Sequence, residues 1–270
     1  MRPHGTFSWP SPVRGWVSAA AHTQLPLDAA ERLDNFFPTA QGARLRSGCV
    51  KHATLPTRAV RFFDYISGST AKLFAGTASD IYEVSAPASS SVTPVADLTG
   101  LSGGDWAGVQ FGTAGGRFAV AVNGTDHAVY YDGSNLLPIV DETVLGLAYD
   151  ALTGGFAVGE TVTGGTSGAS AEILAIAPSS ATAGLLYVGA VTSGPFADNE
   201  TITDGATGSA TSNIPSGIAT SSTISITNVA TKDLSQTWLH QERLFFVEKD
   251  TLSAWYLPIE SIGGAASEIN

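Results

Sequence analysis

The chain of 270 residues has little of what several protein classes require. Its one cysteine, Cys49, excludes a framework of internal disulfides. Charged residues make up 14% of the sequence, a level too low for the lysine- and glutamate-rich surfaces of helical bundles. No apolar run reaches the roughly 18 residues of a membrane span, and the first residues lack the apolar stretch of a signal peptide. We therefore expect a protein without a membrane segment, rich in turns and β structure.

Cations are missing from a large part of the chain. Residues 118–231 contain ten acids and neither lysine nor arginine, whereas residues 1–72 hold nine of the thirteen cations and only four acids. One interpretation is that a sparsely charged β module needs few cations. The other is that surfaces of opposite sign meet different partners. An acidic surface would repel DNA phosphates rather than capture them.

A phrase of sixteen residues occurs twice. The range 156–171 recurs forty residues later as 196–211, with seven identities. Such a duplication indicates a small β unit built twice. Glu160 and Glu200 hold the same position in the two copies, and we expect them to stabilise turns, because no Asp-x-Asn-x-Asp loop supports a calcium site. The expected core of this module consists of Phe156, Val162, Ile173, Ile176, Leu186, Val188, Phe196 and Ile202.

Three hairpin patterns flank the module. Residues 72–84, 117–133 and 243–256 each begin with a cation, continue as an apolar strand, turn on Gly, Asn or Asp and return with aromatic residues. Three to four strands that recur after about 45 residues are typical of β-propeller blades, and closure needs at least four blades. We expect neighbouring chains, or a chain that continues past Asn270, to complete the scaffold. The three hairpins are preceded by further candidate strands at 60–65, 106–111 and 235–239.

The predicted organisation begins with an irregular arm over residues 1–58. Within it, Asp28–Leu33 is predicted as one short helix with Asp28 as its N-cap and Pro38 beyond its end, and 43–48 as a short strand. The predicted fold class is all-β, with an open or incomplete propeller-like scaffold and an inserted, duplicated β-module. The further boundaries are 59–150 for blades, 151–215 for the module and 216–270 for the return to a blade.

Motifs of catalysis are missing from the sequence. No histidine pair has metal-ligand spacing, and no Gly-x-Ser-x-Gly elbow or phosphate-binding loop occurs. The acidic pair Asp141–Glu142 is adjacent in the chain, so the two side chains point apart, whereas general acid–base chemistry needs them to converge. The stretch 102–106 is similar to the Asp-box of sialidase propellers but has a different residue order. We predict a protein that is not an enzyme, with no catalytic residue, metal or cofactor; a propeller hydrolase is the enzymatic alternative.

Four short segments of the N-terminal region resemble a family of tailed-bacteriophage virion proteins, the tail nozzle (tail tubular protein B-like) proteins. These segments are Gly15–Ser18, Leu25–Ala30, Leu33–Pro38 and Arg44–Gly48. The stretch Gly159–Ala169 also resembles small β-modules inserted in phage structural proteins.

The resemblance implies a virion protein assembled in the host cytoplasm, without contact to a membrane. It would form a homo-oligomeric ring below the portal and adaptor rings, bind these and other tail proteins, and surround a channel that DNA crosses without specific binding. Aromatic and arginine side chains dominate interfaces. The arm residues expected to make assembly contacts are Trp9, Trp16, Phe36, Phe37, Arg44 and Arg46.

Two other assignments within the virion are open. The duplicated module could serve as the head of a receptor- or glycan-binding tail component, which would need aromatic side chains that converge on a groove. The chain could also be a head–tail adaptor or a capsid-associated protein. The stoichiometry of a ring does not follow from the sequence.

Overall fold

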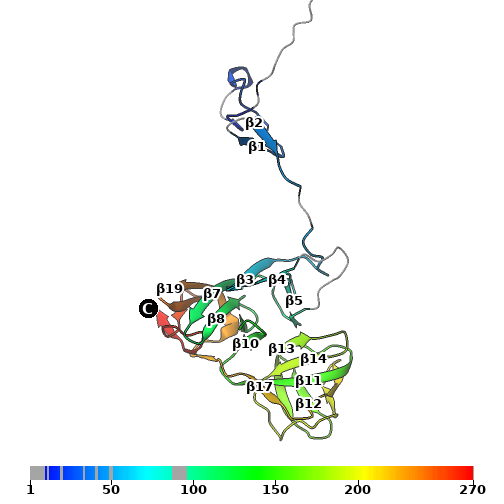
Figure 1. Cartoon of the computed structure of the whole chain (residues 1–270). Helices are drawn as coiled ribbons and strands as arrows, with labels where there is room; N and C mark the ends of the chain where they lie inside the picture. The colour runs from blue at the N-terminus through cyan, green and yellow to red at the C-terminus, as the bar shows by residue number, and fades with distance from the viewer. Residues whose placement is uncertain are drawn as a thin grey trace, which may run out of the picture. The chain divides into compact units, whose positions relative to one another are not determined.

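The computed structural model of the protein describes residues 10, 12–18, 21–32, 34–39, 42–48, 51–86 and 96–269. The chain divides into two compact units, Met1–Lys51 and His52–Asn270, each described here by itself (Figure 1). The described residues form strands and two short 3-10 turns, without any α-helix. The prediction of an all-β protein is therefore confirmed.

The N-terminal unit is built around one hairpin. Strand β1 (Phe36–Thr39) pairs antiparallel with β2 (Gly42–Leu45), so that Phe36 lies opposite Leu45 and Phe37 opposite Arg44. A 3-10 turn, η1 (His22–Gln24), precedes the hairpin.

The helix predicted over residues 28–33 is wrong for its described part, residues 28–32. The amide of Ala29 donates to the carbonyl of Pro26, which closes a turn. Ala30 then exchanges backbone hydrogen bonds with the segment around Trp16 and forms a parallel bridge with that residue. Because these bridge bonds take the backbone groups of Ala30, a helix cannot use them. Asp28 binds Arg14 at 2.9 Å instead of capping a helix, and Pro38 lies within β1.

The larger unit contains three groups of four antiparallel strands (Figure 1). The first group is the end of an eleven-stranded sheet that continues into later strands of the chain, and the other two groups are separate four-stranded sheets. The first sheet comprises β3 (Arg61–Ser67), β4 (Thr70–Gly76), β5 (Asp80–Glu83) and β6 (Leu98–Thr99). The middle sheet comprises β7 (Ala107–Thr113), β8 (Gly116–Val122), β9 (Ala128–Tyr131) and β10 (Leu136–Ile139). The last sheet comprises β19 (Leu234–His240), β20 (Arg243–Glu248), β21 (Ala254–Tyr256) and β23 (Ser267–Ile269).

The three predicted hairpins and the strand before each of them are confirmed by these pairings. Strand β7 packs against both β3 and β19, so the first strands of the three sheets lie side by side. Two short strands, β18 (Ile226–Thr227) and β22 (Gly264–Ala265), pair in parallel next to the last sheet, and the 3-10 turn η2 (Thr231–Asp233) leads into β19.

The duplicated sequence forms two hairpins that pair with each other. The first copy supplies β12 and β13, the second supplies β15 and β16, and β12 pairs with β15. Pairings of β11 with β14 and β16, and of β14 with β13, close a ring of six strands, while β17 pairs with the start of β11. The prediction of a β unit built twice is confirmed. The strands are β11 (Val144–Thr153), β12 (Thr161–Gly164), β13 (Ser170–Pro178), β14 (Gly184–Val188), β15 (Thr201–Thr203), β16 (Ser209–Ser212) and β17 (Ala219–Ser222).

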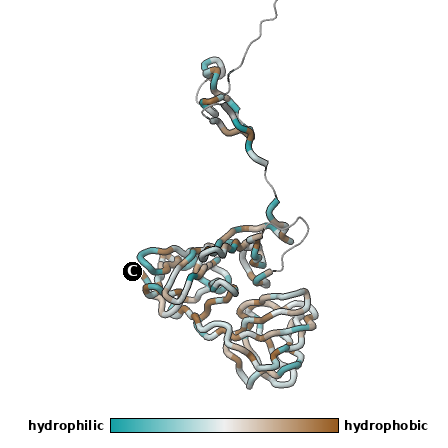
Figure 2. The backbone as a smooth tube through the Cα atoms, viewed as in Figure 1, coloured by the Kyte–Doolittle hydropathy of each residue, from teal (hydrophilic) through white to brown (hydrophobic). Residues whose placement is uncertain are grey.

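Side chains of all three sheets share one core. Every residue of β9 and β10 is buried, so this half of the middle sheet is covered on both faces. Trp106, Phe74 and Phe246, one near each sheet, are the largest fully buried side chains. Figure 2 shows apolar segments along the strands of this unit, interrupted by polar turns.

The duplicated module has a second core, which contains all eight side chains predicted for it. This core also includes Leu147, ahead of the predicted start at residue 151. Leu174, Ala175 and Tyr187 of the module belong to the shared core instead, and Ile176 of β13 pairs with Thr99 of β6. The module therefore packs into the scaffold through β13 and β14 as well as enclosing a core of its own.

Asp97, beside β6, gives the first sheet a pH-dependent stability. Burial raises the pKa of its carboxyl to about 6, although the amide of Glu83 donates to it. In the unfolded chain an aspartate has a pKa of about 3.9. The folded state thus binds more protons between these values, and the free energy of unfolding falls as pH rises through this window.

We expect Asp97→Asn to raise the free energy of unfolding at pH 7 by about 1–3 kcal/mol, because the ionised form no longer has to be buried. Urea unfolding between pH 4 and pH 7 measures this, and the variant should have a flatter profile. Thr70→Asn, at an exposed position of β4, is the control and should leave the profile unchanged. Equal slopes for Asp97→Asn and the unmodified chain would contradict the assignment.

Candidate interaction surfaces

Apolar side chains of the N-terminal unit are exposed to solvent. Trp16 is 68% exposed, Phe36 44% and Phe37 53%. Phe36 and Phe37 are adjacent in β1 and therefore point to opposite faces of the hairpin. A two-stranded hairpin without a buried face is marginally stable in water, and here apolar side chains are exposed on both faces of the hairpin.

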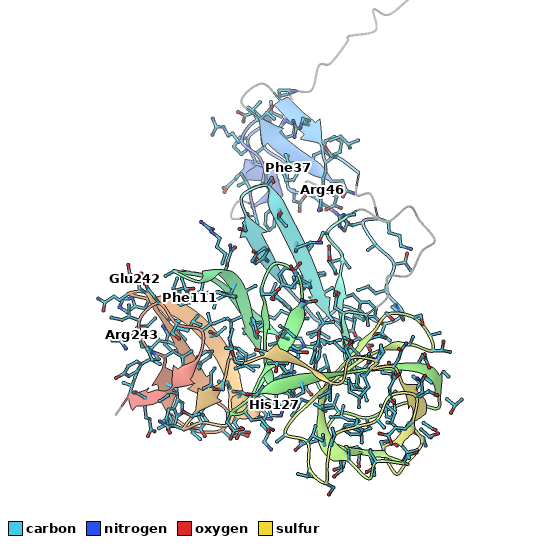
Figure 3. The ribbon with its side chains drawn as sticks, turned by 60° about the horizontal axis from the view of Figure 1, so that its bottom comes forward. Phe37, Arg46, Phe111, His127, Glu242 and Arg243 are labelled. Carbon is cyan, nitrogen blue, oxygen red and sulfur yellow. The ribbon has the colours of Figure 1, made fainter. Side chains whose placement is uncertain are left out.

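Five of the six predicted assembly residues lie in the described part of this unit. Arg44 lies directly across from Phe37, and the amide of Arg46 donates to the carbonyl of Asn35, next to Phe36. Figure 3 labels Phe37 and Arg46 on the hairpin. Trp16 lies in the bridge to Ala30. Trp9 lies outside the described residues.

The sequence prediction missed two exposed leucines of the same unit. Leu45 is 62% exposed and lies across from Phe36, and Leu27 is 57% exposed. Leu45 lies between Arg44 and Arg46, and this alternation predicts a buried side chain on the face opposite the arginines, so its exposure had no signal in the sequence.

The first sheet has an outer face that the middle sheet does not cover. Phe63 and Tyr65 of β3 enter the shared core, so Phe62, Asp64 and Ile66 point the other way. Phe62 is 55% exposed and Ile66 48%. Beside them lies an apolar hollow of about 440 Å³. It is lined by His52, Ala53, Leu55, Thr57, Ala59, Phe62, Leu73 and Val84.

The last sheet carries a row of aromatic rings on its outer face. Trp238 lies across from Phe245, which lies across from Tyr256. The first two rings stack with centroids 5.3 Å apart, and the second pair is 5.8 Å apart. The guanidinium of Arg243, labelled in Figure 3, lies 5.2 Å from the centre of the Tyr256 ring. Trp238 remains 38% exposed.

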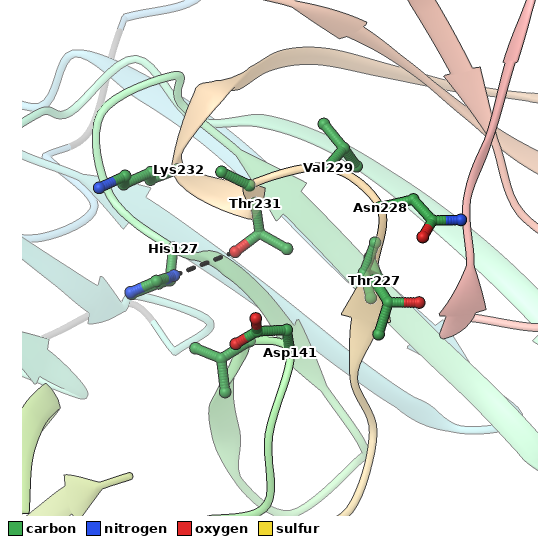
Figure 4. A pocket seen from close by; sticks show the side chains of 10 residues that line it. His127, Asp141, Thr227, Asn228, Val229, Thr231 and Lys232 are labelled. Carbon is green, nitrogen blue, oxygen red and sulfur yellow. Dashed lines mark hydrogen bonds between the residues drawn. The ribbon is translucent and has the colours of Figure 1, made fainter.

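A polar pocket of about 340 Å³ lies beside η2 (Figure 4). The hydroxyl of Thr231 donates to the carbonyl of Ile139 at 2.7 Å, so it accepts from Nδ1–H of His127 at 3.0 Å. This leaves Nε2 of His127 as an acceptor, and burial lowers the pKa of the ring, which is neutral at pH 7.

In this arrangement the hydrogen bond between His127 and Thr231 does not have the direction of a nucleophile–base pair. A base would have to accept the proton of Thr231, whereas His127 donates to that oxygen. Asp141 and Lys232 also line the pocket, but Glu142 turns away and accepts from the amide of Ala190 at 2.8 Å. The pocket therefore offers hydrogen bonds to a polar molecule and no paired carboxylates among its described residues.

The carboxylate of Glu200 binds the loop of the other copy of the duplicated unit. One oxygen accepts from the amides of Thr166 and Ser167, at 2.9 and 2.8 Å. The other accepts from the hydroxyl of Ser167 and from the amide of Ala197, each at 2.7 Å. The predicted role in stabilising turns is confirmed for Glu200, which is 4% exposed, whereas Glu160 of the first copy is exposed.

The described residues contain no group of three or more His, Cys, Asp or Glu side chains placed to hold a metal ion. Among them there is also no helix long and apolar enough to cross a membrane. Comparison with protein-family models, with curated proteins and with solved structures gave no match for this chain.

Proposed function

We propose that the chain is a structural component of a bacteriophage tail, a nozzle protein that forms a ring around the DNA exit channel below the portal and adaptor. The observation that carries the proposal is the N-terminal unit, a compact hairpin unit whose aromatic side chains and arginines are exposed. Its residues are also those that resemble tail nozzle proteins. Among the described residues of this unit no large apolar side chain is buried, so a neighbouring ring that covers them would add stability.

The scaffold supports an open, propeller-like arrangement. The middle sheet is a four-stranded meander, and the first and last groups also contain four antiparallel strands each, the number in a propeller blade. The first strands β3, β7 and β19 pack next to one another, which is how the inner strands of successive blades are arranged. Such a scaffold suits a ring component.

The charge distribution fits a channel that DNA crosses without being held. Residues 118–231, which form most of the middle sheet and the whole duplicated module, contain ten acids and no lysine or arginine. Surfaces of this sign repel phosphates and so lower the affinity for DNA.

A glycan-binding head loses support from the module's aromatic residues. Phe156, Tyr187 and Phe196 are buried in the two cores. Aromatic side chains that stack on sugar rings have to be exposed, and these three are not. The nozzle assignment is therefore preferred over the receptor-binding alternative.

We expect deletion of residues 1–51 to abolish binding to adaptor rings while residues 52–270 stay folded, because the larger unit has its own cores. Adaptor rings isolated from the source virion are mixed with the full chain or the deleted chain, and co-sedimentation measures binding. The double substitution F36S/F37S should weaken binding at least tenfold, a loss typical of central aromatic contacts.

The matched control is Leu252→Ser, which removes a fully exposed apolar side chain from the larger unit and should leave binding unchanged. If the full chain does not bind adaptor rings, the nozzle assignment fails. If the chain without residues 1–51 binds as well as the full chain, the role of the N-terminal unit fails.

A further inference from the structure

We propose that two copies of the chain associate head to tail, with the outer face of the last sheet of one copy packed against the outer face of the first sheet of the other. The inference rests on the homo-oligomeric part of the proposed function, and it is independent of the assignment to a tail. In this arrangement each of the two surfaces is covered by a second copy of this chain.

The middle sheet shows how this fold covers such a face. It lies between the first and last sheets, and β7 packs against β3 on one side and β19 on the other. The contact is close, since a Cβ added at Gly108 of β7 would lie 2.4 Å from Cβ of Phe63. Within the described residues, β19 has such a neighbour on one side only. On the outer side of the first sheet, Ala53, Leu55 and Ala59 pack on Ala75, Tyr82 and Val84, so the open part of this face is β3 with Phe62, Asp64 and Ile66.

Both outer faces are apolar where they lack a neighbour. On β3, Phe62 and Ile66 are about half exposed, at 55% and 48%. On the last sheet, the row of Trp238, Phe245 and Tyr256 is flanked by Ile269, which is 46% exposed. Apolar side chains that form a contiguous surface of this kind mark a protein–protein contact.

The charges of the two faces are complementary. Alternation along the strands places one carboxylate, Asp64, on the outer face of β3. It places one full positive charge, Arg243, on the outer face of β19 and β20. Asp64 is exposed and forms no ion pair with a described residue, and Arg243 uses only one of its donors, to the carbonyl of Leu257. Opposite charges within apolar contacts select the partner and the register.

The two faces differ, so the contact is heterologous and leads to a closed ring where the rotation allows it. Each copy supplies three sheets, and two copies supply six. Closed propellers have four to eight blades. A second copy is therefore sufficient to cover both outer faces of the first.

Charge exchange tests this contact. The unmodified chain should form dimers in a sedimentation-velocity concentration series. D64R alone and R243D alone should each weaken dimerisation about tenfold or more, because each brings like charges together at both contacts. An equimolar mixture of the two single variants should restore dimers, since every contact between unlike variants again joins opposite charges. The double variant D64R/R243D should also recover, and native mass spectrometry distinguishes the mixed dimer by its mass.

Loss of folding in one variant does not confuse the result, because an unfolded chain cannot be rescued by mixing. A chain that stays monomeric at every concentration overturns the inference. So does a dimer that tolerates both single substitutions but disappears when residues 1–51 are deleted, which would place the contact in the N-terminal unit. Failure of adaptor binding with intact dimers, by contrast, would reject only the tail assignment.

Discussion

Replacing Glu200 by alanine is expected to lower the stability of the duplicated module by about 3–5 kcal/mol, because the change leaves four donors without an acceptor in a nearly buried site. Three of these donors are backbone amides, of Thr166, Ser167 and Ala197, and the fourth is the Ser167 hydroxyl. Hydrogen exchange of the Thr166 and Ser167 amides reports the local free energy of opening.

The duplication provides the matched control. Glu160 occupies the equivalent position in the first copy but is exposed, so Glu160→Ala should change stability by no more than about 0.5 kcal/mol. Equal effects of the two substitutions would show that the network around Glu200 does not stabilise the module.

The pH dependence of this effect has a defined sign. Burial alone would raise the pKa of Glu200, but the hydrogen bonds from Ser167, Ala197 and Thr166 outweigh it and the pKa is lowered. A lowered pKa stabilises the fold above the pKa of the unfolded chain, and this contribution is lost as pH falls through the folded pKa. The difference between the unmodified chain and Glu200→Ala should therefore shrink in acid, opposite to the behaviour of Asp97.

Gly104→Ala is expected to destabilise the scaffold by about 3 kcal/mol, because the added methyl group would overlap the backbone of a neighbouring sheet. A Cβ at this position would lie 2.2 Å from the carbonyl oxygen of Thr77. Thr77 cannot withdraw, since it is fully buried and its amide donates to Asp80 across the turn between β4 and β5. Urea unfolding followed by tryptophan fluorescence measures the change.

Gly112→Ala on β7 is the control for any glycine replacement. The nearest atom to its added Cβ would be Cγ of Arg117, at 4.0 Å, so this methyl group has room. We expect a change within about 1 kcal/mol, with a gain from the less flexible unfolded chain. If Gly104→Ala behaves in the same way, the first and middle sheets are not packed as closely as described.

The strands of the scaffold could be predicted because their patterns are local. Apolar runs such as 117–122 end at turn residues, and these signals do not depend on distant parts of the chain. The module core was also predictable, since the repeat places Phe156 and Phe196 at the same position of its two copies and both are buried. Gly103, Gly104 and Asp105 were harder to interpret, because the need for glycine at position 104 is set by Thr77, in the turn between β4 and β5.

The predicted helix does not form, because its sequence signals describe an isolated segment, whereas here the backbone pairs with another part of the chain. Asp28 and Glu31 have the spacing of a helix start, but Ala30 bonds to a segment fifteen residues earlier in the chain. Likewise, the sequence showed that Glu160 and Glu200 are equivalent but not which of them is buried. That depends on position 164, where glycine makes room: an added Cβ would lie 2.4 Å from the carboxylate of Glu200.

The equivalent position of the second copy holds Asp204, which accepts from the amides of Ala206 and Gly208 of its own loop, each at 2.9 Å. The loops of the two copies are therefore stabilised by carboxylates from different positions. One loop is held by a side chain from the other copy, and the other loop by a side chain of its own.

Thr163 of β12 lies directly across from Thr203 of β15, its own counterpart in the repeat. A residue that pairs with its equivalent marks a local two-fold axis, so the module has the form of a dimer whose halves share one chain. A free half would leave β12 as an open edge, ready to pair with any similar strand. Joining the halves raises their effective concentration to a level that separate chains do not reach, and so protects a surface that would otherwise aggregate.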